Sequence, residues 1–207
     1  IDITMFMSDM SLNENLSSTP QDRRELMDLV ERMQNAFTTI AKSKVPTIAL
    51  AHGFCIGGAT SLVSACDIRL ATKDAKFSIG ETKLGLVADV GVIQRMPKIV
   101  SSGDMNELAL TGRIFDGEHA ERIRFVSKAY DNSDELFEAG EKLANEISSN
   151  SKRIVQATKQ ALEKSSNLTI DQGLEYAKLW STSFLVSEDL REGVMAFLEK
   201  RDPKFNE

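Results

Sequence analysis

One short stretch of this chain constrains its fold more than any other. Thr47 to Ala51 form an apolar run of strand length that leads directly into the glycine-rich turn His52-Gly-Phe-Cys-Ile-Gly57-Gly58. A helix is predicted to follow, from about Ala59 to Cys66. A buried strand that passes through glycines into a helix is typical of α/β proteins, in which strands alternate with helices.

The rest of the chain continues this alternation and then becomes helical. Further extended stretches are predicted at Asp67–Thr72, Ala75–Ile79 and Phe125–Tyr130. The predicted helices run from Thr19-Pro20 to a stop at Val45-Pro46, and over residues 90–99, 104–110 and 117–124. Beyond them, four residues are predicted to cap C-terminal helices: Ser133, Ser151, Thr169 and Ser187. We therefore predict an α/β body over residues 1–130 and a helical region over residues 131–207.

Composition excludes several classes of protein. No apolar run approaches the roughly 20 residues that span a bilayer, and a net charge of −6 argues against a general nucleic-acid binder. Two cysteines and two histidines are too few for a disulfide framework or a zinc site, so we expect no metal. The low cysteine content indicates a reducing compartment but does not say which one, so mitochondrion, peroxisome and cytoplasm all stay open. Because the chain begins with Ile1 and has no signal-peptide pattern, we expect it to be a fragment, with residues 5–18 forming a connection.

The turn from Gly53 to Gly58 has the features of an anion-binding site. Glycines allow a ligand to approach the backbone, and unpaired N–H groups at a helix N-terminus stabilise negative charge. The turn matches neither of the glycine patterns that bind dinucleotides and nucleoside phosphates. An oxyanion is one interpretation; glycines that only permit close packing are an equally good one.

Two carboxylates form the second candidate group. Glu81 and Asp89 lie eight positions apart, and the residues immediately before Asp89 are almost entirely apolar. A pair of carboxylates can remove a proton from one carbon and return one to another, which is the logic of a double-bond isomerase. The alternative is that Glu81 is solvated and that Asp89 merely caps a helix starting at Val90.

Four motifs in sequence order resemble the crotonase, or enoyl-CoA hydratase/isomerase, superfamily. They are His52-Gly-Phe-Cys-Ile-Gly-Gly, Ala65-Cys-Asp-Ile-Arg69, Phe77-Ser-Ile-Gly-Glu81-Thr-Lys-Leu-Gly85-Leu and Gln94-Arg-Met-Pro97. The resemblance continues to Glu192-Gly-Val-Met-Ala-Phe-Leu-Glu-Lys-Arg201 near the C-terminus. It implies a spiral of ββα units, with N-terminal strands missing from this chain, and C-terminal helices that pack in a homotrimer or hexamer.

The resemblance also implies a substrate and a set of site residues. The substrate would be an acyl-CoA thioester, with no further cofactor. Its enolate oxygen would be held by the backbone N–H groups of Ile1 and Gly58, with Gly57 and Ser61 beside the substrate. Preorganised donors of this kind are commonly the largest catalytic term in such sites.

The acidic positions indicate which reaction is run. Hydratases of this family use two glutamates, but the first of these positions is Ser61 here, and a serine has no useful basicity near neutral pH. The run Gly85-Leu-Val-Ala-Asp89-Val-Gly91 resembles the dienoyl-CoA isomerase subgroup, which has acidic residues at all three positions. The expected reaction is conversion of 3,5-dienoyl-CoA to 2,4-dienoyl-CoA in fatty-acid β-oxidation. The alternatives are a 3-enoyl-CoA to 2-enoyl-CoA isomerase, an enoyl-CoA hydratase, or a non-catalytic CoA-binding or assembly protein.

Overall fold

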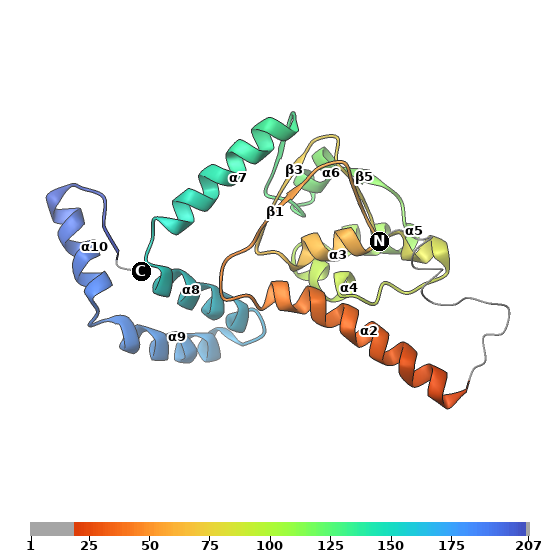
Figure 1. The fold of residues 1–207 in the computed structure, drawn as a ribbon, viewed down its shortest axis with the longest axis horizontal. Coiled ribbons are helices and arrows are strands. Elements are labelled where there is room, and N and C mark those ends of the chain that lie inside the picture. Colours follow the sequence, from red (N-terminus) through yellow and green to blue (C-terminus); the bar gives the residue numbers. More distant parts are fainter. Residues whose placement is uncertain (1–18, 206–207) are drawn as a thin grey trace. The chain divides into compact units, whose positions relative to one another are not determined.

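A computed structural model describes residues 19–205 (Figure 1). Within that range the chain divides into two units. The first holds residues 19–43 and 47–138, and the second holds residues 44–46 and 139–205. The predicted connection over residues 5–18, the Ile1 position and any preceding strands lie outside the described residues.

Two small sheets organise the first unit. Strands β1 (Ile48–Ala51), β3 (Ile68–Thr72) and β6 (Lys128–Tyr130) form a parallel sheet in the order β1-β3-β6. Strands β2 (Phe54–Ile56), β4 (Lys76–Ser78) and β5 (Phe115–Asp116) form the other, in the order β2-β4-β5. In this second sheet β2 and β4 are parallel, whereas β5 runs antiparallel to β4. From β1 to β4 the chain alternates between the two sheets, as expected of a spiral of ββα units; β5 then stays in the second sheet and β6 returns to the first.

Helices connect and cover these strands. The long helix α2 (Pro20–Ala41) begins where it was predicted to, with a capping box in which Thr19 and Asp22 each accept a hydrogen bond from the other's backbone N–H. Helix α3 follows the glycine turn, and α2 contacts α3 directly (Figure 1). The remaining elements of this unit are α3 (Gly58–Ala65), η1 (Gly80–Leu84), α4 (Val92–Arg95), η2 (Met96–Lys98), α5 (Ser102–Thr111) and α6 (Gly117–Arg122).

A cluster of aromatic rings anchors the core of this unit. Phe77 of β4 stacks on Phe115 of β5 with ring centroids 5.5 Å apart, and Phe125 meets Phe77 edge-on at the same distance. Phe77 and Phe125 are fully buried, and burial of one such side chain stabilises the fold by about 1.5–3 kcal/mol. This packing fixes β4, the strand that leads into Glu81.

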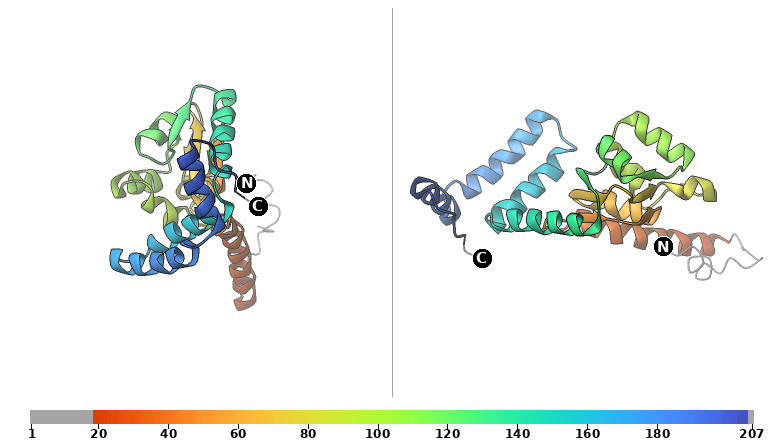
Figure 2. Two further views of the ribbon diagram at one scale, coloured as in Figure 1. Left: turned by 90° about the vertical axis from the view of Figure 1, so that its left-hand side faces the viewer. Right: turned by 90° about the horizontal axis from the view of Figure 1, so that it is seen from above.

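The second unit is helical. Helix α7 (Ser133–Ser148) begins in the first unit, and α8 (Lys152–Ser165), α9 (Ile170–Phe184) and α10 (Glu188–Glu199) follow, with α8 and α9 side by side (Figure 2). The Ser151 hydroxyl donates to the buried carboxylate of Asp189 at 2.6 Å and so ties the start of α8 to α10. As predicted, Ser151, Thr169 and Ser187 cap their helices.

Several element boundaries differ from the predictions, among them the following three. The cap of α7 is Asn132, whose Oδ1 accepts from the Glu135 N–H at 2.9 Å, so the choice of Ser133 was wrong by one residue. Helix α2 ends at Ala41, before the expected stop at Val45-Pro46. The strand predicted from Phe125 is present only over Lys128–Tyr130, because the N–H of Phe125 instead donates to the Ala120 carbonyl at 2.8 Å. The apolar side chain of Phe125 is explained by its burial in the core and not by membership of a strand.

Candidate active site

The candidate site lies where two parallel strands end together. Ile56 of β2 and Ser78 of β4 are register partners, so the segments that follow them emerge at the same edge of the sheet. The Ser78 carbonyl accepts two hydrogen bonds, from the Gly57 N–H at 2.9 Å and from the Thr60 hydroxyl at 3.0 Å. These bonds fasten the glycine turn to the strand that leads to Glu81.

Glu81 lies against the backbone of Gly57. A Cβ at Gly57 would stand 3.3 Å from Oε1 of Glu81, and the positive φ of Gly57, +58°, is one that side-chain-bearing residues rarely adopt. Glycine therefore provides both the turn and the room for the carboxylate. The structure thus brings Glu81 to the glycine turn, although Gly57 and Glu81 are 24 positions apart in the sequence.

The segment that carries Glu81 is held from both ends. Its 3₁₀ helix, η1, ends at Gly85 with a φ of +73°, and the Thr82 hydroxyl donates to the Ala109 carbonyl of α5 at 2.7 Å. The carboxylate itself is less satisfied: its Oε2 is buried and has no hydrogen-bond partner in the described part of the chain. Buried polar atoms are nearly always paired, so this oxygen can still accept a hydrogen bond from a group outside the described residues.

Gly58, the residue after Gly57, begins helix α3. The residue before it, Gly57, is the N-cap and provides no side-chain cap. Among residues 19–205, no acceptor is found for the Gly58 N–H. Such a group at a helix N-terminus can hold negative charge. The second oxyanion donor named from the sequence, Ile1, is not among the described residues.

Ser61 lies one helical turn beyond Gly57, whose carbonyl accepts from the Ser61 N–H at 3.0 Å. The Ser61 side chain is fully buried, and its hydroxyl has no partner within the described range. The hydroxyl is therefore enclosed beneath the turn rather than exposed in an open groove. A second buried, unpaired oxygen close to the same turn adds to the unsatisfied polar character of the site.

Asp89 is presented differently from Glu81. Its side chain is exposed, and its carboxylate makes no hydrogen bond or ion pair with any residue in 19–205, while its neighbours Ala88 and Val90 are buried. The interpretation of Asp89 as a helix cap is wrong, because α4 begins at Val92 and its N-cap is Gly91. The structure leaves this carboxylate free for another purpose.

Two other chemical features bear on the site. Burial raises the pKa of the Cys55 thiol in β2, which keeps it protonated and argues against a thiolate nucleophile beside the turn. Within the described residues, there is no cluster of three metal-binding side chains and no helix suited to crossing a membrane.

The sequence analysis did not identify three residues near Asp89 as functional candidates. Gln34 and Thr38 of α2, together with Arg95 of α4, make hydrogen bonds that reach the Asp89 loop. Gln34 and Asp89 are 55 positions apart. Since no local pattern connects residues at such a separation, only the fold could identify the contacts of Gln34 and Thr38 with this region.

Comparison with known proteins identifies relatives over nearly the whole chain. Residues 5–207 match the enoyl-CoA hydratase/isomerase family. The mitochondrial Delta(3,5)-Delta(2,4)-dienoyl-CoA isomerase of Dictyostelium discoideum is 47% identical over 91% of this chain and 64% of its own length. The peroxisomal enzyme of the same name from Arabidopsis thaliana is 39% identical over 96% of this chain and 73% of its own.

Solved structures agree with this assignment of relatives. The crystal structure of an enoyl-CoA hydratase/isomerase family protein from Hyphomonas neptunium superimposes with a TM-score of 0.83 at 31% identity, over 99% of this chain and 74% of that one. The chain therefore spans slightly less than two thirds of the length of the Dictyostelium enzyme. It spans about three quarters of the length of the Arabidopsis enzyme and of the Hyphomonas protein.

Proposed function

The chain belongs to the enoyl-CoA hydratase/isomerase family, and on that premise we propose that it converts 3,5-dienoyl-CoA to 2,4-dienoyl-CoA. The observation that carries this proposal is the position of Glu81. Its carboxylate lies against Gly57, beside the free N–H of Gly58, with one buried oxygen unpaired within the described chain. An acid next to an oxyanion donor is the arrangement that enolate chemistry requires.

In the proposed reaction a proton leaves one carbon and a proton enters another. Asp89 removes a proton from carbon 2, and the electrons move onto the thioester oxygen, which Gly58 and Ile1 hold as an enolate. As the enolate collapses, the 2,3 and 4,5 double bonds form and the electron pair released at carbon 6 takes up a proton. Glu81 delivers this proton to carbon 6, so that no atom is gained or lost overall. Exchange with solvent afterwards removes the proton from Asp89 and returns one to Glu81.

Ser61 supports isomerisation over hydration. A hydratase needs a base to activate water, and the buried serine hydroxyl next to the turn has no useful basicity near neutral pH. Gly57 and Ser61 would instead shape the site around the thioester.

A second candidate reaction is isomerisation of 3-enoyl-CoA to 2-enoyl-CoA, with Glu81 as the acid and base and Asp89 as an accessory. The exposure of the Asp89 side chain favours this candidate, because Glu81 alone lies in contact with the glycine turn. Both reactions use the same oxyanion donors, so the substrate distinguishes them.

We propose further that the acyl-CoA thioester is the only ligand and that the protein works as a homotrimer or hexamer. The second unit exposes large apolar side chains, among them Ile170 of α9, Val186, and Phe197 of α10, with exposures of 82%, 96% and 83%. Large exposed apolar patches are typical of interaction surfaces.

The relatives are named as mitochondrial and peroxisomal proteins, and both organelles are compatible with the free cysteines.

The test is to measure formation of the conjugated 2,4-dienoyl thioester by its ultraviolet absorbance. Glu81→Gln and Asp89→Asn keep the size of each side chain and remove its acid–base function. Each is expected to lower kcat at least about 10²-fold, the usual contribution of one acid–base group. If both variants retain the rate of the unmodified enzyme, the proposed roles are wrong.

A further inference from the structure

The backbone around Asp89 is held by helix α2, far away in sequence. The Gln34 side-chain amide donates to the Asp89 carbonyl at 2.8 Å. This bond holds the main chain of the very residue whose carboxylate is free. α2 and the loop belong to the same unit, so the contact is part of one packed body.

A second connection reaches the next residue through Arg95. Its guanidinium donates from Nη1 to the Val90 carbonyl at 3.2 Å and from Nη2 to the Thr38 hydroxyl of α2 at 3.1 Å. The carbonyls of two consecutive residues, Asp89 and Val90, are thus both tied to α2, one directly and one through a bridging side chain.

Gly91 makes this bridge possible. A Cβ at Gly91 would stand only 1.8 Å from Nη1 of Arg95, and the φ of Gly91 is +115°. The guanidinium therefore occupies the space that any other residue would fill at position 91. Arg95 is partly buried, which lowers its pKa, and no carboxylate within residues 19–205 pairs with it. Its charge is directed toward a carbonyl and a hydroxyl, and charge-assisted hydrogen bonds are stronger than neutral ones.

The Asp89 carboxylate has no partner of its own in the described chain, so its position depends on the backbone that carries it. A proton-transfer group must be held close to its carbon, and small displacements reduce the rate steeply. We propose that Gln34, Thr38 and Arg95 are positioning residues that hold Asp89 for proton transfer. This inference rests on the proposed function, in which Asp89 acts on the substrate.

Thr38 offers the cleanest test of the bridge. Thr38→Val keeps the shape of the side chain and removes the hydroxyl that accepts from Arg95, whereas Thr38→Ser keeps the hydroxyl. The control is Thr39→Val, since among residues 19–205 the hydroxyl of Thr39 bonds only to the Asn35 carbonyl of its own helix. We expect Thr38→Val to lower kcat for 3,5-dienoyl-CoA roughly tenfold with KM unchanged, and Thr38→Ser and Thr39→Val to retain the original kcat.

Gln34 is tested in the same way. Gln34→Ala removes the amide without weakening the helix, because alanine is the best helix former, and Asn35→Ala is the matched control on the next residue. If Gln34 acts through Asp89, Gln34→Ala should lower kcat in the native enzyme and have no further effect in the Asp89→Asn background. A general structural role would lower kcat by the same factor in both backgrounds and would overturn the inference.

Hydrogen exchange provides a measurement that does not depend on activity. Amides of residues 85–91 should exchange faster in Gln34→Ala and Thr38→Val than in Asn35→Ala and Thr39→Val. Unchanged exchange in all four variants would overturn the inference. If Asp89→Asn abolishes isomerisation while Gln34→Ala and Thr38→Val keep full activity, positioning is wrong and the proposed function stands. If Asp89→Asn is fully active, the proposed role of Asp89 and the inference that rests on it both fail.

Discussion

The carboxylate of Glu81 packs against Gly57. A Cβ atom at position 57 would lie 3.3 Å from Oε1 of Glu81, which is closer than most Cβ contacts in proteins. This contact joins the acid of the proposed reaction to the turn that presents the oxyanion donor. It also explains why a glycine is needed there, since the backbone at Gly57 has a φ of +58°.

Gly57→Ala is expected to lower the free energy of unfolding by about 1–3 kcal/mol through backbone strain and to lower kcat by displacing Glu81. Gly53→Ala is the matched control. Gly53 also has a positive φ, +65°, but a Cβ there meets no atom within 4 Å. Chemical denaturation should show a loss of stability in both variants, and steady-state kinetics a loss of kcat in Gly57→Ala alone. Equal kcat values in the two variants would contradict the proposed contact between the turn and the acid.

Replacement of Gly58 tests the oxyanion assignment. A valine at the first position of α3 covers the approach to the backbone N–H while leaving the helix in place. Turnover of dienoyl-CoA should fall at least about 10²-fold, in keeping with the loss of one oxyanion donor. Circular dichroism checks that the fold is retained. A folded Gly58→Val enzyme with full activity would rule out this donor.

Ser61 is expected to set the balance between isomerisation and hydration. Ser61→Glu should raise the rate of 2-enoyl-CoA hydration relative to dienoyl-CoA isomerisation, because it adds a base beside the turn. It should also lower the free energy of unfolding, since Ser61 is fully buried and has no space for a longer side chain. Ser61→Gln is the control of equal size, expected to lose stability to a similar extent and to gain no hydration. A gain of hydration in Ser61→Gln would show that size, not basicity, causes the change.

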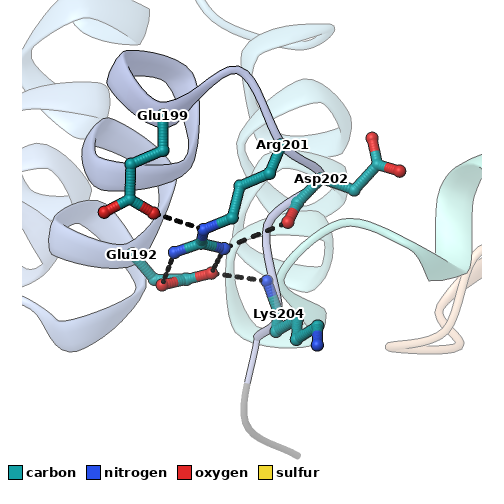
Figure 3. A network of polar contacts seen from close by, with 5 residues as sticks. All are labelled: Glu192, Glu199, Arg201, Asp202 and Lys204. Atoms are coloured by element: carbon teal, nitrogen blue, oxygen red, sulfur yellow. Dashed lines mark hydrogen bonds and ion pairs between the residues drawn. The ribbon is translucent and has the colours of Figure 1, made fainter.

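The C-terminal segment is expected to show a pH dependence of its own. The Glu192 carboxylate accepts two hydrogen bonds from the Arg201 guanidinium, at 2.6 and 3.0 Å, and one from the Lys204 N–H at 2.7 Å (Figure 3). The bonds from Arg201, followed by that from Lys204, lower the pKa of Glu192 from 4.5 to about 2. A lowered pKa in the folded state means that this contribution to stability is complete above about pH 4.5 and is lost as the pH falls toward 2.

A pH titration followed by the nuclear magnetic resonance shift of the Glu192 side-chain carboxyl carbon should therefore have its midpoint near pH 2. The free energies of unfolding of the original protein and of Glu192→Gln should differ most above pH 5 and converge as the pH falls toward 2. A midpoint close to 4.5 would show that the ion pair with Arg201 does not persist in solution.

Local patterns in the sequence were sufficient for the features that depend on neighbouring residues. The capping box at Thr19, the turn at Gly57 and the start of α3 all follow from residues within a few positions of one another. Strand β2 was not predicted, because it has only three residues and two of them, Phe54 and Ile56, are exposed instead of marking a buried face. Its identity as a strand comes from pairing with β4.

In the candidate site, too, residue identities could be predicted from local sequence, whereas their arrangement could not. The carboxylates and glycines could be named from their types and from the family resemblance, but their arrangement depended on the register between Ile56 and Ser78. The contacts of Gln34 and Arg95 with the Asp89 loop join segments more than 50 positions apart or depend on the space left by Gly91. Contacts of this kind arise from tertiary packing, on which a local sequence pattern carries no information.

One measurement tests the central claim most directly. The purified full-length protein should be assayed side by side with 3,5-dienoyl-CoA, 3-enoyl-CoA and 2-enoyl-CoA at matched chain length, and kcat/KM compared for the three. Since Glu81 lies against the turn, Asp89 is a second, exposed carboxylate on the loop that follows, and Ser61 stands where hydratases carry a glutamate, kcat/KM should be highest for 3,5-dienoyl-CoA and lowest for hydration of 2-enoyl-CoA. Efficient hydration of 2-enoyl-CoA, or no turnover of any of the three thioesters, would contradict the account.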